Sequence, residues 1–287
     1  MDLCNISDIK ELLTRNGFRF SKSMGQNFLI ADWVPRDIAA ASEAERDCGV
    51  LEIGPGIGPL TVELSKRAGK VVAVELDRSL LPLLSETLAD CDNVQIVSGD
   101  VLKLDLAQLI ETQFQGLTPM VCANLPYNIT TPVLTALLEL KRFSAITVLI
   151  QREVAKRVCA APGTGDYGSF SLFCRYYAHC ELLFDVPPDC FLPAPKVTSS
   201  VIRLIPRAEK PQEVEDEAFF FRVVRASFAQ RRKTLLNGLS AVFGGQCPKE
   251  TIRQIILDCG LPEDIRGERL GIPEFAQIAR ILKRTCN

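Results

Sequence analysis

Short apolar runs alternate with amphipathic stretches along the first half of the chain. Runs such as VLEIG at 50–54 and VVAVELD at 71–77 are rich in β-branched residues and have the length of buried strands. Between them, apolar residues recur every three or four positions, as in helices that bury one face. The pattern predicts further strands at 94–100, 120–127 and 145–151, and helices at 7–16, 31–44, 60–68, 78–89, 105–111 and 131–140. This alternation predicts an α/β fold, with a parallel sheet and helices on both of its faces.

The pattern changes after Gln151. Two helices are expected at 152–160 and 170–178. They are followed, within 180–206, by two strands and a proline-rich loop between them. We expect these strands to extend the sheet as an antiparallel hairpin.

A charged stretch, RAEKPQEVEDE, follows the hairpin and is typical of a linker. Beyond it, residues 216–287 show short helical patterns that glycine and proline interrupt. The sequence therefore predicts two domains: an α/β domain at 1–208 and a small all-α domain at 209–287.

The composition is that of a globular protein, with 47% hydrophobic and 24% charged residues in a chain of 287. No apolar run approaches the roughly 20 residues that span a membrane, and the first residues lack the apolar centre of a signal peptide. The 11 cysteines are scattered and include no C-x-x-C pair, which indicates a reducing compartment and no metal site. We therefore expect a cytoplasmic protein without a membrane anchor or a metal, and a structural role for the single histidine, His179.

The net charge of −2 disfavours nucleic-acid binding when it is averaged over the chain. The segment FRVVRASFAQRRKTLLNGL nevertheless contains no acidic residue. Its cations are Arg222, Arg225, Arg231, Arg232 and Lys233. A basic helix with this composition is typical either of contact with a phosphate backbone or of a solvated helix face.

Four successive predicted strands finish in a polar residue. These are Glu52, Glu75, Asp100 and Asn124, spaced by 23, 25 and 24 residues. This spacing is that of one strand–helix unit, so the four side chains are expected along one edge of the sheet. Ligands of open α/β sheets bind outside the carboxyl ends of the strands, which predicts a shared site there.

The turn EIGPGIGPLT follows the first of these strands and departs from the dinucleotide pattern G-x-G-x-x-G. Its glycines, Gly54 and Gly56 among them, would let the backbone approach a ligand closely. Glu52 is expected to hold an ammonium group or the amides of the turn. Glu75 is expected to accept hydrogen bonds from ribose hydroxyls, and Asp100 is placed to meet an adenine amino group.

The stretch VCANLPYNITTP interrupts an apolar strand with Asn124, Leu125, Pro126 and Tyr127, which a simple turn would also explain. With the glycine turn and the acidic strand ends, it resembles the motifs of class I S-adenosylmethionine-dependent methyltransferases. The tetrapeptide NLPY resembles the N/D-x-P-Y/F/W motif of enzymes that methylate an amino group on a planar system. That motif also occurs in DNA adenine and glutamine methyltransferases, so it does not identify the substrate by itself.

Further segments narrow the resemblance. SMGQNFL at 23–29, QREVAKR, FLPAPKVTSSVIRL and FAQRRKTLLNGL, together with NLPYNITTP, resemble the KsgA family of ribosomal RNA adenine dimethylases over essentially the whole chain. The resemblance implies a Rossmann-like class I methyltransferase domain and S-adenosylmethionine as cofactor. It implies as partner the 16S ribosomal RNA of the assembling 30S subunit, in which two adjacent adenosines near the 3′ end are dimethylated at N6. Cofactor contacts are implied for Asn27, Leu29, Gly54, Glu75, Asp100 and Asn124.

The resemblance also gives the tetrapeptide a mechanism. The Asn124 side-chain oxygen and the Leu125 carbonyl would accept the two amino protons, Pro126 would hold the turn, and Tyr127 would offer a ring for the base. Phe191 would either clamp the other face of the base or pack in the core. RNA contacts are expected from the basic segment and from Arg152, Lys156, Arg157 and Lys196. Pro59 stands where the family usually has alanine, a position at which the start of a helix tolerates proline.

Two alternatives stay open at this point. The first is an Erm-type enzyme that methylates large-subunit RNA, although its tetrapeptide usually has Ile after Asn. The second is an assembly factor that binds RNA without catalysis, which the complete set of Glu52, Glu75, Asp100 and Asn124 disfavours. In either case we expect a monomer.

Overall fold

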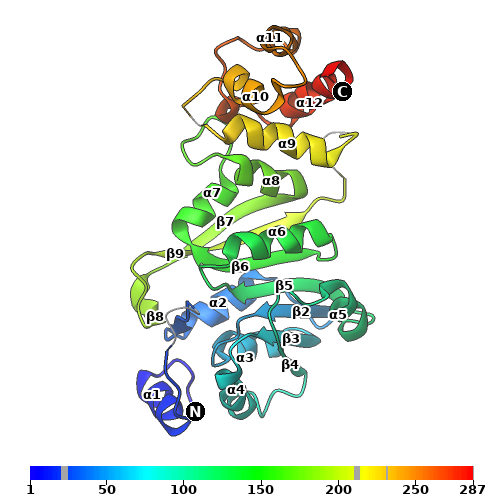
Figure 1. Cartoon of the computed structure of the whole chain (residues 1–287). Helices are drawn as coiled ribbons and strands as arrows, with labels where there is room; N and C mark the ends of the chain where they lie inside the picture. Colours follow the sequence, from blue (N-terminus) through cyan, green and yellow to red (C-terminus); the bar gives the residue numbers. More distant parts are fainter. Residues whose placement is uncertain (21–24, 210–213, 231, 287) are drawn as a thin grey trace. The chain divides into compact units, whose positions relative to one another are not determined.

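The computed structural model describes residues 1–20, 25–209, 214–230 and 232–286 (Figure 1). The chain divides into two compact units, one of Met1–Ala155 and His179–Pro206 and the other of Lys156–Ala178 and Arg207–Asn287. The predicted division at 208/209 differs from this one in the segment 156–178 and, by two residues, at 207–208. The segment 156–178 belongs to the helical unit because its aromatic rings pack against those of a later helix.

The sheet of the first unit has seven strands in the order β4-β3-β2-β5-β6-β9-β7. Neighbouring strands from β4 to β6 are parallel, and β9 runs antiparallel to β6. The bounds are β2 Cys48–Ile53, β3 Lys70–Glu75, β4 Val94–Ser98, β5 Thr118–Asn124, β6 Ala145–Gln151, β7 Ala178–Val186 and β9 Ser199–Pro206. The predicted α/β sheet, including the added strands at its far edge, is confirmed.

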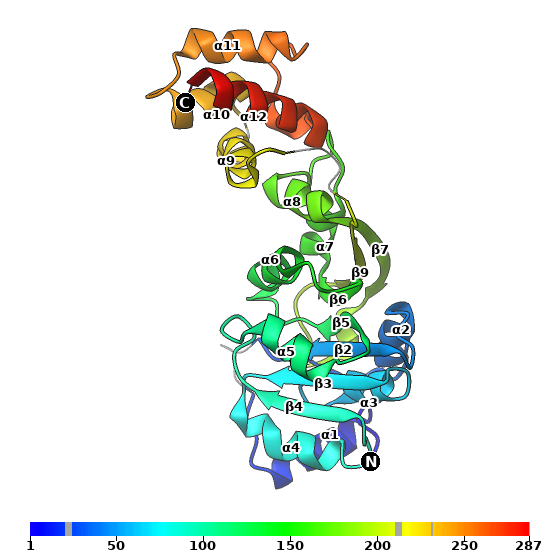
Figure 2. The same cartoon turned by 90° about the vertical axis from the view of Figure 1, so that its right-hand side faces the viewer.

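Helices lie on both faces of this sheet. Figure 2 shows α6 on one face and α2 and α3 on the other. The helices of the first unit are α1 Ile6–Arg15, α2 Trp33–Ala41, α3 Pro59–Ser65, α4 Leu81–Thr87, α5 Leu106–Gln113 and α6 Thr130–Leu140, with the short turn η2 at Arg78–Leu80. Because β2 lies between the two layers, every one of its residues is buried.

The central strands end earlier than the pattern predicts. β3 ends at Glu75, β4 at Ser98 and β5 at Asn124, so the polar residues of the motifs stand at the strand ends or in the turns beyond them. Pro126 has no N–H with which to continue a ladder, and the Asp77 side chain instead accepts the Ser79 N–H and starts a turn. Because these strands end early, the residues that follow them form turns at the carboxyl-terminal edge of the sheet.

A second sheet consists of two short strands that the periodicity does not predict. β1 (Phe28–Leu29) pairs antiparallel with β8 (Phe191–Leu192), and Leu29 stands opposite Phe191. Two residues are too few to show a period of alternation. This pairing fastens the segment 25–29 to the proline-rich loop between β7 and β9.

The second unit consists of helices. They are α8 Ser169–Tyr177, α9 Glu217–Phe228, α10 Leu235–Phe243, α11 Lys249–Asp258 and α12 Ile272–Cys286, with η4 at Gly267–Arg269; α7 (Arg152–Cys159) begins in the first unit and ends in this one. Phe173 and Tyr176 of α8 contact Phe221 and Phe220 of α9, with ring centroids 5.5 and 5.4 Å apart. These aromatic contacts explain why α8 groups with the later helices.

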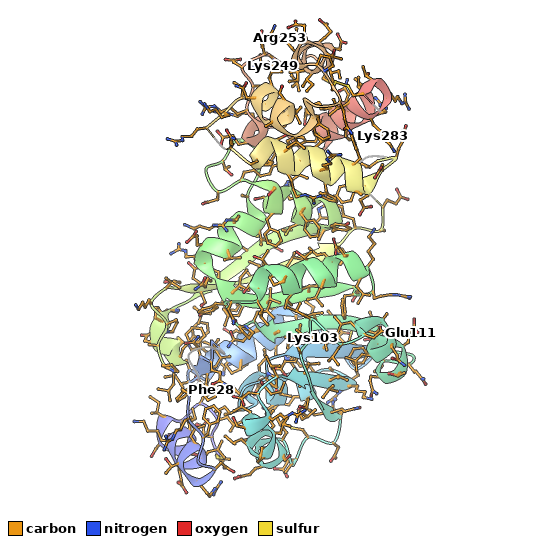
Figure 3. The ribbon with its side chains drawn as sticks, in the orientation of Figure 1. Phe28, Lys103, Glu111, Lys249, Arg253 and Lys283 are labelled. Atoms are coloured by element: carbon orange, nitrogen blue, oxygen red, sulfur yellow. A yellow bond between two sulfur atoms is a disulfide. The ribbon has the colours of Figure 1, made fainter. Side chains whose placement is uncertain are left out.

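The helix α9 begins after Asp216, whose side chain makes two polar contacts. Asp216 accepts a hydrogen bond of 2.9 Å from the Phe219 N–H, which caps the helix. Lys283 of α12 lies 3.2 Å from the same carboxylate, so two helices meet at this cap (Figure 3).

The structure joins Cys247 and Cys286 in a disulfide, and nine cysteines are free. The scattered cysteines, which indicated a reducing compartment, did not predict this pair, because 39 residues separate the two and only the packing of α12 brings them together. Among the described residues, no three or more His, Cys, Asp or Glu side chains form a group suited to a metal. No helix in the described part of the chain is long and apolar enough to cross a membrane.

Candidate active site

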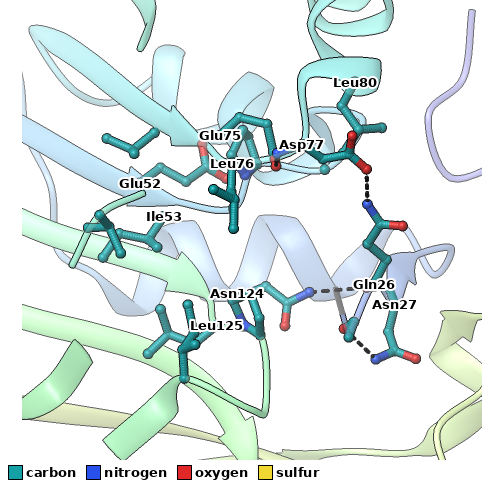
Figure 4. Close-up of a pocket in the computed structure, with 18 of the residues that line it drawn as sticks. Gln26, Asn27, Glu52, Ile53, Glu75, Leu76, Asp77, Leu80, Asn124 and Leu125 are labelled. Atoms are coloured by element: carbon teal, nitrogen blue, oxygen red, sulfur yellow. Dashed lines mark hydrogen bonds between the residues drawn. The ribbon is translucent and has the colours of Figure 1, made fainter. Parts of the chain in front are cut away.

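One pocket lies at the carboxyl ends of β2, β3, β4 and β5 (Figure 4). Glu52, Glu75, Asp100 and Asn124 all line it, so the four polar strand ends converge as their spacing predicts. The glycine turn, the segment 25–29 and the NLPY tetrapeptide complete the lining. Every residue of this pocket belongs to the first unit.

Two glycines of the turn carry its backbone past the pocket. Gly54 and Gly56 have φ values of 70° and 63°, which residues other than glycine rarely adopt. A Cβ atom on Gly56 would lie 3.1 Å from the ring of Phe28. The turn therefore needs glycine for its backbone conformation, and Gly56 also allows Phe28 to approach closely.

Glu52 is a buried acid with one oxygen unsatisfied. Its residue is 1% exposed, and its Oε2 has no hydrogen-bond partner in the described structure. Burial, with a smaller contribution from the charge of Glu75, raises the pKa of Glu52 to about 8. A carboxyl group in this state is suited to a cationic or hydrogen-bond-donating ligand that would satisfy the free oxygen.

Glu75 ends β3 and is 6% exposed. One of its oxygens accepts the Asp77 N–H at 2.8 Å, which fixes the side chain at the edge of the pocket. Burial raises the pKa of Glu75, and backbone hydrogen bonds only partly oppose this effect. Asp100 lies in the turn after β4, where Lys103 approaches its carboxylate at 3.4 Å. The pocket thus has acidic groups at three successive strand ends.

The segment 25–29 is tied to two of the strand ends. The Gln26 side-chain amide donates to Asp77 at 2.7 Å, and the Asn124 side-chain nitrogen donates to the Asn27 carbonyl at 3.3 Å (Figure 4). Asn27 and Leu29, which the resemblance assigns to the cofactor, both line the pocket. Gln26 and Asp77 are pocket residues that the motif analysis missed, although GQNFL and VELD contain them.

The tetrapeptide Asn124–Tyr127 leaves β5 in a turn that several contacts fix. The Pro126 carbonyl accepts the Ile129 N–H and the Thr130 hydroxyl, each at 3.2 Å. The Tyr127 hydroxyl lies 2.7 Å from the Ser199 hydroxyl of β9. Both ends of the Tyr127 residue are therefore anchored, one in the turn and the other on a strand.

Phe191 does not take the position of a base clamp. Its residue is 2% exposed, and its ring lies in the core with Leu29 and Val186. Phe191 is also not among the residues that line the pocket. Of the two roles considered for Phe191, its position fits packing in the core. The β1–β8 pairing holds its backbone beside Leu29, with which its ring shares the core.

The basic residues expected to contact RNA are exposed in both units, except Arg231, which lies outside the described residues. The exposed ones are Arg152, Lys156, Arg157, Lys196, Arg222, Arg225, Arg232 and Lys233. Arg152 lies 3.3 Å from Asp185, and the guanidinium of Arg222 lies 4.7 Å from the centre of the Phe243 ring.

The prediction of one basic helix that carries Arg222, Arg225, Arg232 and Lys233 is wrong in one respect. α9 ends at Phe228 and α10 begins at Leu235, so Arg232 and Lys233 lie in the connection between them. Thr234 caps α10 through the Asn237 N–H at 3.4 Å, which starts a new helix.

The sheet order and the pocket at its switch point define a Rossmann-like class I methyltransferase. The fold is similar to that of a dimethyladenosine transferase from Plasmodium falciparum, with a TM-score of 0.74 and 22% identity over 89% of this chain and 97% of that one. It is also similar to the 23S rRNA methyltransferase ErmE, with a TM-score of 0.67 and 25% identity over 90% of this chain and all of that one.

Sequence comparison specifies the family. The family model described as ribosomal RNA adenine dimethylase matches residues 17–267. Ribosomal RNA small subunit methyltransferase A of Geobacillus sp. (strain WCH70) is 46% identical over 98% of both chains. The protein of that name from Geobacillus thermodenitrificans is 48% identical over 98% of this chain and 97% of its own. The chain belongs to the ribosomal RNA adenine dimethylase family, and the prediction of an rRNA adenine dimethyltransferase is confirmed.

Proposed function

We propose that this protein dimethylates N6 of two adjacent adenosines near the 3′ end of 16S ribosomal RNA, within the assembling 30S subunit. The relatives that are 46% and 48% identical are small-subunit enzymes by name, whereas the large-subunit enzyme ErmE is 25% identical. This contrast favours the small subunit over the Erm-type alternative. The observation that carries the chemistry is the orientation of the Asn124 amide beside the acidic pocket.

The pocket residues fit S-adenosylmethionine. The unsatisfied Oε2 of Glu52 is suited to the amino acid end of that cofactor, and the backbone of Gly54 and Gly56 lines the same pocket. Glu75 and Asp100 both line the pocket, which supports the proposal that they accept hydrogen bonds from the ribose hydroxyls and the adenine amino group, respectively. When bound, the cofactor supplies a methyl group on a sulfonium, whose positive charge the acidic lining favours.

The hydrogen bond to Asn27 determines which atom of Asn124 meets the substrate. Because the nitrogen donates to the Asn27 carbonyl, the side-chain oxygen is left as an acceptor toward the pocket (Figure 4). Turning the amide over would place two carbonyl oxygens against each other. The oxygen can then accept one N6 proton, and the Leu125 carbonyl the other.

These two acceptors address the low nucleophilicity of the adenine amine. Its lone pair is delocalised into the ring, and holding both protons favours a more pyramidal nitrogen with the lone pair aimed at the methyl carbon. Bound S-adenosylmethionine would supply the methyl group to this nitrogen, which would lose one proton to water for each methyl group it gains. Such a methyl transfer depends on positioning more than on a strong base, which suits a chain whose single histidine lies outside the pocket.

The adenosine must leave its stack to reach this site. Tyr127 lines the pocket and is partly exposed, so its ring can stack against the displaced base. Exposed cations of each unit are suited to the phosphate backbone of the RNA. We further propose that the protein acts as a monomer in the cytoplasm, where small subunits assemble.

One experiment separates this function from its alternatives. The chain is incubated with labelled S-adenosylmethionine and either immature 30S subunits or 50S precursors, and the modified adenosines are mapped. We expect label as N6,N6-dimethyladenosine at two adjacent positions of 16S RNA only. Label confined to large-subunit RNA would contradict the proposal in favour of an Erm-type enzyme. Binding to 30S particles without label in either RNA would instead indicate a non-catalytic assembly factor.

A further inference from the structure

A buried hydroxyl on β9 holds the aromatic residue of the NLPY tetrapeptide. The Ser199 hydroxyl lies 2.7 Å from the Tyr127 hydroxyl, although 72 residues separate them in the chain. Ser199 is fully buried and stands opposite Gln151, the last residue of β6, in the sheet register. The partner of the Tyr127 hydroxyl is therefore on a paired strand, whose position is more rigid than that of a loop.

The two contacts of Tyr127 restrict the ring from opposite ends. Its backbone follows Pro126, whose carbonyl the Ile129 N–H and the Thr130 hydroxyl hold in the turn. Its hydroxyl is held by Ser199. A tyrosine side chain has two rotatable torsions, so anchoring the hydroxyl in addition to the backbone selects one orientation of the ring plane.

We propose that Ser199 is a positioning residue, which orients the Tyr127 ring so that the base stacks with its amino group at Asn124. The inference rests on the proposed function, because it concerns where the adenine ring lies in that site. Ser199 does not line the pocket and reaches the substrate only through Tyr127. Without the hydrogen bond, the ring would sample further orientations, and the amine would spend less time in line with the methyl group.

The neighbouring residue provides a matched control. Ser200 is also fully buried on β9, and its hydroxyl donates to Asp185 at 2.6 Å. Adjacent residues of a strand point to opposite faces of the sheet, so the Ser200 hydroxyl lies away from Tyr127. Ser200→Ala thus removes another part-buried hydrogen bond of a β9 serine without touching the ring.

The test compares Ser199→Ala, Tyr127→Phe, the double variant, Ser199→Thr and Ser200→Ala in the full chain. We expect Ser199→Ala and Tyr127→Phe each to lower kcat on immature 30S subunits by about 3- to 10-fold, the worth of one hydrogen bond. The double variant should lose no more than either single variant, because both remove the same contact. Ser199→Thr keeps the hydroxyl and should restore kcat. Ser200→Ala should keep the wild-type kcat.

A second measurement needs no RNA. The chain has four tyrosines, so 3-fluorotyrosine labelling produces a simple ¹⁹F spectrum in which Tyr127→Phe identifies one resonance. Ser199→Ala should shift that resonance, while the affinity for S-adenosylhomocysteine stays within about twofold of wild type. An unshifted resonance or a wild-type kcat in Ser199→Ala would overturn the inference, as would an equal loss of kcat in Ser200→Ala. If Ser199→Ala does not fold, wild-type kcat in Tyr127→Phe overturns it instead.

Failure of the proposed function has a different signature. A wild-type chain that methylates no small-subunit RNA contradicts the proposed function, whatever Ser199 does. A wild-type chain that is active, with Ser199→Ala equally active, contradicts only the positioning role.

Discussion

Gln26 donates a hydrogen bond of 2.7 Å to Asp77, across 51 residues of sequence. Asp77 follows β3 closely and also accepts the Ser79 N–H at 2.9 Å, which starts the short turn η2. The bond therefore connects the segment 25–29 to the part of the pocket where the ribose of the cofactor is proposed to lie. Because Gln26 and Asp77 both line the pocket, their hydrogen bond joins two parts of its wall.

Gln26→Ala should weaken this connection and accelerate ligand release. A partly exposed hydrogen bond to a carboxylate contributes on the order of 1 kcal/mol, so the affinity for S-adenosylhomocysteine should fall about fivefold. Stopped-flow dissociation should show the change in the off-rate. The matched control is Gln254→Ala, which removes a Gln–Asp bond of 2.8 Å from α11. Equal off-rates in Gln26→Ala and wild type would contradict the role of this contact.

The buried carboxyl of Glu52 should make stability depend on pH. Its pKa is raised from 4.5 to about 8 by burial, so the folded state binds its proton more tightly than the unfolded state does. Stability should therefore fall as pH rises from about 4.5 to 8, by about 5 kcal/mol at most. Chemical unfolding of wild type and Glu52→Gln between pH 5 and about 9 measures the difference, and the variant should lack this contribution. Parallel curves for the two proteins would show that Glu52 is ionised when folded.

Binding of the cofactor should release a proton from the same group. With a pKa of about 8, the Glu52 carboxyl should be mostly protonated near pH 7 in the free protein, and a nearby cation favours its ionised form. Calorimetry of S-adenosylmethionine binding in buffers of different ionisation enthalpy should detect this release. Subtracting the result for Glu52→Gln removes the proton that the cofactor itself contributes. A variant that releases as many protons as wild type would exclude Glu52 as the source.

Gly56→Ala should disturb the pocket more than a comparable glycine substitution elsewhere. Both Gly56 and Gly116 have positive φ, 63° and 73°, so alanine at either costs on the order of 1 kcal/mol in backbone strain. Only Gly56 also has a ring 3.1 Å from the added Cβ, whereas Gly116 has no neighbour within 4 Å. Binding of S-adenosylhomocysteine should thus fall in Gly56→Ala and stay unchanged in Gly116→Ala. Equal effects in both would mean that the Phe28 contact is unimportant.

Asn124→Ala should abolish methylation while leaving the cofactor in place. Losing an aligned acceptor at the reacting amine is expected to lower kcat by roughly 100-fold or more. The affinity for S-adenosylhomocysteine should fall only modestly, because Glu52, Glu75 and the glycine turn keep their positions. Single-turnover assays with immature 30S subunits measure the chemical step directly. Dimethylation at the wild-type rate would show that Asn124 is only a turn residue.

Much of the structure of the methyltransferase unit can be predicted from the sequence alone. Buried parallel strands are continuous apolar runs, so their positions and alternation with helices follow from local composition. The convergence of Glu52, Glu75, Asp100 and Asn124 follows as well, because parallel strands bring their carboxyl ends to one edge. The family follows from short motifs with fixed spacing.

Other features depend on contacts between distant segments, which leave no periodic signal. The assignment of α8 to the helical unit comes from aromatic packing against α9, and the inward position of Phe191 comes from the two-residue pairing of β8 with β1. The Cys247–Cys286 disulfide was also decided in this way.

The sequence by itself thus determined the class of fold, the edge at which the site lies and the chemistry of the residues there. The tertiary structure decided how those residues are held: Gln26 on Asp77, the Asn124 nitrogen on Asn27, and the Tyr127 hydroxyl on Ser199. The physical reason is that periodicity records which face of an element is buried. The partner of a single polar atom depends on which strands and turns lie side by side once the chain has folded.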